Sequence, residues 1–173
     1  MASYYYLIAS LPELSAEGDM PITYDEFLDM CSTTISESKY KLLENLTLSS
    51  CDGPLMKEWQ AFYGNLMCEV NRQRSSILGR QYDREYEQEY ENTRIASNAI
   101  AAKNPLEAEK LLLSYQFEKL DSLVGLHSFD DTVLFGYAIK LKLLERQSCF
   151  VQKKGKEEFE TLFKTIQQRV YTL

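Results

Sequence analysis

Asn104-Pro105-Leu106-Glu107 follows the order of a helix start, with a capping side chain, a proline at the first helical position and a carboxylate in the first turn. Asparagine accepts a hydrogen bond from a free backbone N–H at this place, and proline lacks the N–H that would otherwise stay unpaired. Ser128 and Asp131 have the spacing of another capping motif. These signals predict two consecutive helices, one starting at Asn104 and one at Ser128.

The second of these helices contains the run Tyr137-Ala138-Ile139-Lys140-Leu141-Lys142-Leu143-Leu144-Glu145-Arg146 and is apolar on two sides. Its two stripes are Leu134, Ala138, Leu141 and Phe135, Ile139, Leu143. A helix with two apolar faces must pack between other helices. We therefore predict an all-α fold with this helix at its centre. Lys153, Lys154 and Gly155 are typical of its C-terminal end.

The rest of the chain adds helix patterns on either side of this segment. They start at Thr23, at Glu37, at Pro54 and at Phe159, and a further one covers Gln81 to Lys103. Residues 4–11 suit a strand by propensity, although their period does not exclude a helix. The expected fold is a bundle or array of about five to six amphipathic helices in one domain, 1–173, with candidate sub-lobes 1–79 and 80–173.

Composition narrows the classes of function. The net charge of −7 comes from 26 acidic and 19 basic residues, and it repels phosphate backbones and anionic lipid headgroups. We therefore expect that the chain does not bind nucleic acids. We also expect its protein partners to be basic. No signal peptide or membrane span is visible in the sequence, which predicts a cytoplasmic protein. Its 4 cysteines are then expected to be reduced and mostly buried.

The sequence shows no pattern of a catalytic, metal or cofactor site. His127 is the only histidine, and a surface or capping role in a turn is expected for it. A di-metal bundle needs two Glu-x-x-His pairs, and zinc needs closely spaced ligands. Gly155-Lys156 lacks the Ser or Thr and the upstream glycine of a phosphate loop. We predict that the chain is not an enzyme and binds no metal, cofactor or nucleotide.

Residues 81–103 carry the sharpest charge pattern. On the predicted helix, Asp83, Glu87 and Glu91 share one face at four-residue spacing, where each like-charge pair costs roughly a few tenths of a kcal/mol. A basic partner would relieve this repulsion, so these three residues are the candidate partner interface. A solvated face steadied by nearby arginines explains the same pattern. Three tyrosines at four-residue steps beside it suit packing against another helix.

Several segments, taken in order, carry a resemblance to a known family. They are Tyr4-Tyr5-Tyr6-Leu7-Ile8-Ala9-Ser10-Leu11-Pro12, Asn104-Pro105-Leu106-Glu107-Ala108-Glu109, Phe129-Asp130 and the run 137–146, with Gly155 and Phe159 after it. Together they resemble a bacterial family of V-type ATPase-associated proteins of unknown function. That family is related to the C/d-type central-stalk connector of V/A-type ATPases, which carries the letter C in prokaryotes and d in eukaryotes. Residues 23–28 and 89–94 are similar to helical segments of this broader family.

The resemblance implies a non-catalytic structural subunit of a rotary ATPase. Members of the broader family form a helical socket on the membrane rotor ring and receive the central stalk, and they bind no nucleotide. The implied partners are therefore the central-stalk subunits and the rotor ring, at the cytoplasmic face of the membrane and without transmembrane insertion. In that family the N-terminal segment is helical, which favours a helix for residues 4–11. The C/d-type connectors are longer than this chain.

Two other hypotheses remain beside this one. In the first, the chain is a helical adaptor for protein–protein interaction that is unrelated to rotary ATPases. In the second, it is an enzyme on a helical scaffold. Stable monomers without affinity for stalk proteins would favour the adaptor, and stoichiometric metal or cofactor in the purified protein would favour the enzyme.

Overall fold

The computed structural model describes residues 4–149 and 159–167, and its regular structure is entirely helical over these ranges. Seven helices follow one another before residue 150, and residues 159–167 are also helical. Their bounds are α1 Tyr5–Ser10, α2 Tyr24–Ser32, α3 Glu37–Glu44, α4 Pro54–Ile77, α5 Tyr90–Ala101, α6 Pro105–Val124 and α7 Asp131–Ser148. The predicted all-α class is confirmed. Residues 4–11, where strand and helix competed, form α1.

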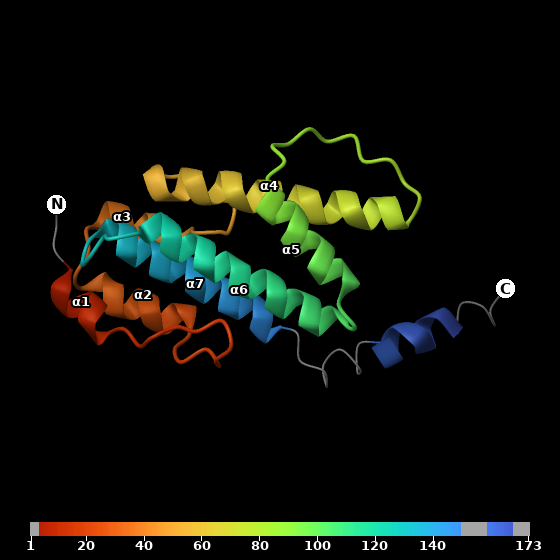
Figure 1. Ribbon diagram of the computed structural model, residues 1–173. Helices are drawn as coiled ribbons and strands as arrows, with labels where there is room; N and C mark the ends of the chain where they lie inside the picture. Colours follow the sequence, from red (N-terminus) through yellow and green to blue (C-terminus); the bar gives the residue numbers. More distant parts are fainter. Residues whose placement is uncertain (1–3, 150–158, 168–173) are drawn as a thin grey trace.

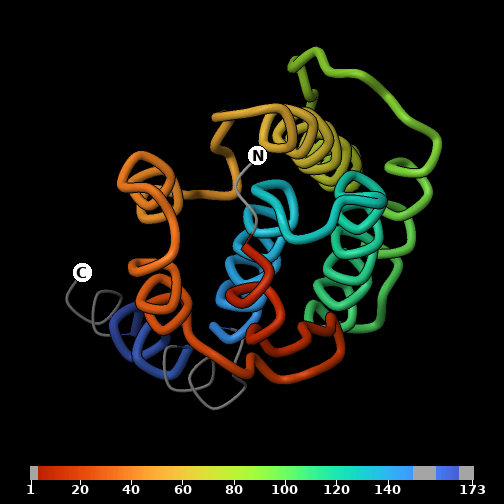
Figure 2. Tube along the Cα trace, turned by 90° about the vertical axis from the view of Figure 1, so that its left-hand side faces the viewer, coloured from red at the N-terminus to blue at the C-terminus, as the bar shows by residue number. Residues whose placement is uncertain are grey.

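Helix α7 is the central element of the bundle, as its two apolar stripes predict. It packs against α2, α4 and α6, and its buried residues include Leu134, Ala138, Ile139 and Leu141. In Figure 1, α4 crosses one side of the α6–α7 pair while α1 and α2 lie on the other. Figure 2 shows α7 near the middle of the bundle, with α4 and α6 on one side of it and α2 on the other.

One hydrophobic cluster joins the described helices. It contains residues from α1 to α7, on both sides of Gly79, and its wholly buried large side chains include Trp59, Phe27 and Leu120. Burial of such side chains contributes about 1.5–3 kcal/mol each, so this cluster is the main source of stability. The N-terminal helices α2 and α3 pack on each other, and α2 also packs on α7.

Most predicted helix starts agree with the structure because their signals act locally. Thr23 and Glu26 form a complete capping box, with Glu26 Oε2 accepting from the Thr23 N–H at 2.7 Å. Asn104 Oδ1 accepts from the Glu107 N–H at 2.9 Å. The start of α7 needs a correction: Asp130, not Ser128, is the N-cap and accepts from the Val133 N–H at 3.2 Å. The turn between α6 and α7 is two residues longer than predicted, because Phe129 has a left-handed φ of 56° and cannot belong to the helix.

The predicted helix from Gln81 to Lys103 is wrong over its first half. Helix α4 ends at Ile77, where Gly79 with a φ of 64° lets the chain leave the helix, as predicted. Residues 80–89 then run without regular structure, and α5 begins only at Tyr90. Two causes are local, since four acidic residues repel along this segment and Glu89 offers no capping hydrogen bond. The third is a tertiary contact of Tyr86, described below.

The predicted C-terminal features lie partly outside the described residues. Lys153, Lys154 and Gly155 fall there, and α7 ends earlier, at Ser148. Of the last predicted helix, residues 159–167 are helical and exposed. Phe159, Leu162, Phe163 and Ile166 are among its exposed side chains, so the predicted apolar stripe forms without being covered by the described part of the chain.

Helices α6 and α7 approach closely at Gly136. A Cβ atom on this residue would lie 2.7 Å from Cγ2 of Val124, near the C-terminal end of α6. Real Cβ atoms do not come so near to another carbon, so a larger residue at 136 must displace the Val124 side chain or move α6 away from α7. The glycine is explained by this contact and needs no functional reason.

We expect Gly136→Ala to lower the free energy of unfolding by about 1–3 kcal/mol, because the added methyl overpacks the α6–α7 contact. Urea unfolding followed by circular dichroism measures the change. The matched control is Val124→Ala together with Gly136→Ala, which removes the clashing methyl groups and should recover part of the loss. A double variant no more stable than Gly136→Ala would contradict this account of the contact.

Candidate functional site

The candidate site is the strap, which we define as residues 80–89, together with the face of α4 beneath it. In Figure 1 the strap arches away from the end of α4 and returns to the start of α5. It carries Asp83, Glu85, Glu87 and Glu89 against two arginines, so its net charge is negative. Two of the predicted interface residues, Asp83 and Glu87, therefore lie here, although not on a helical face.

The structure separates the three predicted interface residues into two settings. Asp83 and Glu87 are exposed on the strap, whereas Glu91 lies in the first turn of α5. Glu91 is exposed as well, and its Oε2 accepts from Arg94 at 2.7 Å. The predicted helix is absent over residues 81–89, so it does not align all three, and only Asp83 and Glu87 lie in the strap.

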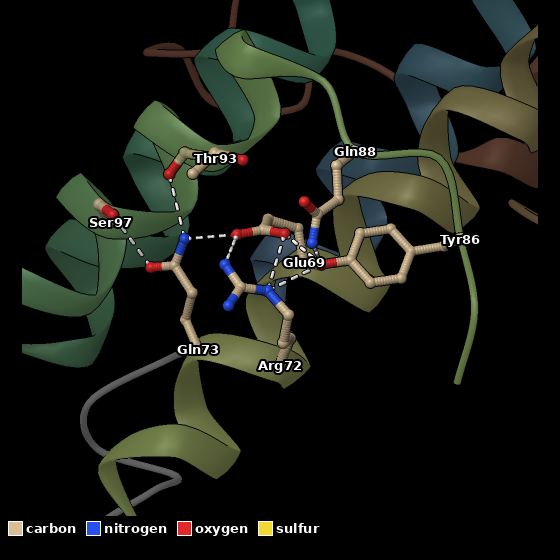
Figure 3. Close-up of polar contacts among 7 residues, drawn as sticks. All are labelled: Glu69, Arg72, Gln73, Tyr86, Gln88, Thr93 and Ser97. Carbon is tan, nitrogen blue, oxygen red and sulfur yellow. Dashed lines mark hydrogen bonds and ion pairs between the residues drawn. The ribbon is translucent and has the colours of Figure 1, made fainter. Parts of the chain in front are cut away.

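Tyr86 ties the strap to α4 through a buried carboxylate. Its hydroxyl donates a hydrogen bond to Oε2 of Glu69, whose side chain is 1% exposed (Figure 3). Arg72 binds both partners of this contact. It donates a hydrogen bond from Nη2 to Glu69 Oε1 at 2.6 Å and another from Nε to the Tyr86 hydroxyl oxygen at 2.9 Å. We call Glu69, Arg72 and Tyr86 the latch.

Gln73 extends the latch to α5. Its Nε2 donates to Glu69 Oε1 at 2.6 Å and to the backbone oxygen of Thr93 at 3.1 Å. Its Oε1 accepts from the Ser97 hydroxyl at 3.0 Å (Figure 3). One carboxylate on α4 therefore organises both the strap and the helix that follows it.

The latch also determines the charge state of its members. Burial alone would raise the pKa of Glu69, but hydrogen bonds from Arg72, Tyr86 and Gln73 outweigh it and lower the pKa to about 2. The same contact with Glu69 raises the pKa of Arg72. Glu69 is thus ionised and paired at neutral pH, which is the condition under which a buried charge is tolerated.

A second tyrosine holds the strap closer to Gly79. The Tyr82 hydroxyl interacts with the thiol of Cys68, which is 4% exposed, and this contact raises the pKa of Tyr82. The rings of Tyr82 and Tyr86 meet edge to face, with centroids 6.3 Å apart. The sequence prediction that this tyrosine stripe packs against a helix is therefore correct for two of its members, whereas Tyr90 is 80% exposed.

The strap and α4 line an open pocket of about 600 Å³. Its lining from α4 includes Gln60, Gly64, Asn65 and Asn71, and its lining from the strap is Arg84, Glu85 and Tyr86. The walls therefore mix carboxamides, a charge of each sign and aromatic surface. This mixture suits a polar polypeptide better than an apolar small molecule, since it offers hydrogen-bonding groups on every side.

Other chemistry-bearing residues are placed as local features. His127 lies exposed in the α6–α7 turn with its Nδ1 2.6 Å from Asp130 Oδ2, in agreement with the expected turn role. Cys31 and Cys68 are buried while Cys51 and Cys149 are exposed, so the expectation of mostly buried thiols holds for half of them. The described part of the chain contains no group of three or more His, Cys, Asp or Glu side chains placed to hold a metal ion.

Comparison with known proteins identifies one family. Residues 73–170 match the family described as "Protein of unknown function (DUF2764)", and this range is more than half of the chain. The chain belongs to this family. The matched range contains Gln73 of the extended latch, the strap and helices α5 to α7. No curated protein and no solved structure matches the chain. No helix of the described residues has the length and apolarity needed to cross a membrane.

Glu69, the residue on which the site depends, belongs to no motif that marks it in the sequence. Its only signal is an acidic residue between Leu66 and Val70, two positions of the apolar stripe of α4. A charge at such a place needs a partner, but nothing in the spacing indicates that Tyr86, in another segment, is one of the partners.

The latch predicts a defined response to acid. Because the pKa of Glu69 is about 2 in the folded state and near 4.5 in the unfolded state, its stabilisation is complete above pH 4.5. It is lost progressively as the pH falls from 4.5 toward 2, by at most about 3 kcal/mol. Urea unfolding of the wild type and of Glu69→Gln across pH 2.5–6 measures this, and the variant should show a shallower decrease. Equal slopes would contradict the role of Glu69.

Loss of the Tyr86 hydroxyl should free the strap. We expect Tyr86→Phe to lower the free energy of unfolding by about 1.5–3 kcal/mol, the usual range for a hydrogen bond to a charged group. It should also speed the alkylation of Cys68 several-fold, because the strap covers this thiol. Peptide mass spectrometry follows each cysteine separately, with buried Cys31 as the internal reference. Tyr90→Phe is the matched control, since Tyr90 is exposed, and a Cys68 rate that is the same in both variants would show that the latch does not hold the strap.

Proposed function

We propose that this protein is a non-catalytic structural subunit of a V/A-type rotary ATPase that links the central stalk to the membrane rotor ring. In this role it works at the cytoplasmic face of the membrane as a peripheral member of the complex, and its partners are the stalk subunits and the ring. The observation that carries the proposal is the ordered resemblance of residues 4–12, 104–109, 129–130 and 137–146 to the proteins associated with that machine.

The properties of the described structure support this role. A connector that transmits torque needs a stiff body, and α4, α6 and α7 form three long helices around one continuous core. A connector also needs a surface for another protein. The strap supplies one, because it projects from the bundle with acidic side chains that make no ion pair among the described residues, Asp83 and Glu87 among them.

The latch suits the strap to such a task. A flexible acidic loop would lose conformational entropy on binding, and ordering its residues costs roughly 1–2 kcal/mol each. The contacts of Tyr86 with Glu69 and Arg72 fix the strap on α4 before any partner arrives. The negative charge is therefore presented in one conformation, which favours fast and specific association with a basic surface.

The first experiment is a pull-down of the tagged full chain from membranes of its own cells, with bound proteins identified by mass spectrometry. We expect stalk and ring subunits of the rotary ATPase in a fixed ratio. Failure to recover them from membranes that contain the intact ATPase would refute the proposal and favour the unrelated helical adaptor. A tagged helical protein of similar charge is the control for non-specific capture.

The strap is tested in the same assay by the double substitution Asp83→Lys and Glu87→Lys. Both positions are exposed, so the fold should be unaffected, and recovery of the stalk subunits should drop about tenfold if the strap faces a basic partner. Glu91 is left unchanged because it pairs with Arg94 in the first turn of α5, where its reversal would weaken the helix itself. Undiminished recovery would remove the strap from the interface while leaving the proposed function in place.

A further inference from the structure

Gly64 lies in the middle of α4 without a reason in the rest of the described structure. A Cβ atom added there would meet nothing within 4 Å apart from the backbone of its own helix. This contrasts with Gly136, where the neighbouring helix leaves no room. A glycine inside a helix is about 0.5–1 kcal/mol less favourable than alanine, and no contact within the described chain requires it.

Gly64 faces the pocket under the strap. It lies about one turn before Glu69, which anchors the strap through Tyr86, and Cys68 lines the same pocket. The pocket therefore has α4 as its floor, with bare backbone at Gly64, and the latched strap as its wall. A bare backbone at the floor of a pocket allows another chain to approach the helix axis closely.

The lining indicates what kind of chain fits. The carboxamides of Gln60, Asn65 and Asn71 have no protein partner among the described residues, and each offers both a donor and an acceptor. A polypeptide backbone presents the complementary groups at every residue. One turn of α-helix fills roughly 500 Å³ as a cylinder of its usual diameter and pitch, so a pocket of about 600 Å³ holds little more than one helical turn or a few residues of extended chain.

Charge indicates which side chains the segment carries. Asp83, Glu85, Glu87 and Glu89 make the strap negative, and Glu85 lines the pocket itself. Arg84 is the only basic side chain of the described lining, and its donors suit backbone carbonyl oxygens of an entering chain. An occupant that complements the carboxamides and Arg84 has backbone N–H and C=O groups without hydrogen bonds of their own. To complement the acidic strap, it also has at least one Lys or Arg side chain directed toward the strap.

We propose that the pocket between α4 and the strap receives a short, extended, basic segment of the stalk partner, with its backbone lying over Gly64. The proposal rests on the proposed function for the identity of the partner, whereas the pocket, the glycine and the charges define the mode of binding. The latch keeps the pocket open in the free protein, so the segment enters a preformed site.

The test is Gly64→Leu, which fills the pocket from its floor. Leucine is a better helix former than glycine and meets no atom at its Cβ, so the urea midpoint should stay the same or rise. The matched control is Ser76→Leu, which adds the same side chain to an exposed position of α4 outside the pocket. Binding of the full chain to purified stalk subunits from the same cells is measured by calorimetry for all three proteins.

We expect Gly64→Leu to bind at least about tenfold more weakly than the wild type, and Ser76→Leu to bind as the wild type does. Equal binding by Gly64→Leu and the wild type would overturn the pocket proposal and leave the proposed function standing. No binding by the wild type itself would overturn both. Gly64→Ala gives a second check, since it should stabilise the free protein yet weaken binding, and tighter or unchanged binding would count against close approach at Gly64.

Discussion

A carboxylate buried in a helical core must be paired, and Glu69 imposes this requirement in the middle of α4. Arg72 and Gln73 lie on the next turn of the same helix, and both donate hydrogen bonds to Oε1 of Glu69. The remaining hydrogen bond comes from Tyr86, which lies beyond the end of α4. The path of the chain from Gly79 to Tyr90 therefore depends on one ionised group, because continuing a helix through residues 81–89 would break the Tyr86 contact and leave Glu69 less than fully paired.

This dependence links the stability of the fold to the shape of its candidate interface. The same contacts that pair Glu69 hold Tyr86 against α4 and join Gln73 to α5. The strap is thus fixed at its centre while its acidic side chains stay in solvent. The pocket beside Gly64 lies between α4 and the strap, and Tyr86 is one of its lining residues. Whatever binds here meets a preformed surface, with a smaller loss of entropy than a free loop would require.

The acidic residues show why the predicted helical face over residues 81–91 does not form. The helix was predicted from residues at four-residue steps, Tyr82, Tyr86 and Tyr90 among them, and on that helix Asp83, Glu87 and Glu91 would share one face. Helical spacing is only a weak indication where like charges repel and no cap favours the start. The three residues are exposed but share no face. Glu69 went unnoticed for the opposite reason, since its importance lies in a contact with Tyr86 from a different segment.

Local signals in the sequence are enough to define the all-α class, the starts of α2, α4 and α6, and the central place of α7. Each of these depends on interactions within one or two turns, such as the Thr23 capping box, or on apolar periodicity, which any compact fold must bury. The course of residues 80–89, the latch and the pocket at Gly64 could be seen only in the folded chain. They arise from contacts between different segments of the chain, where the pairing of one buried charge adds to the local causes that disfavour a helix.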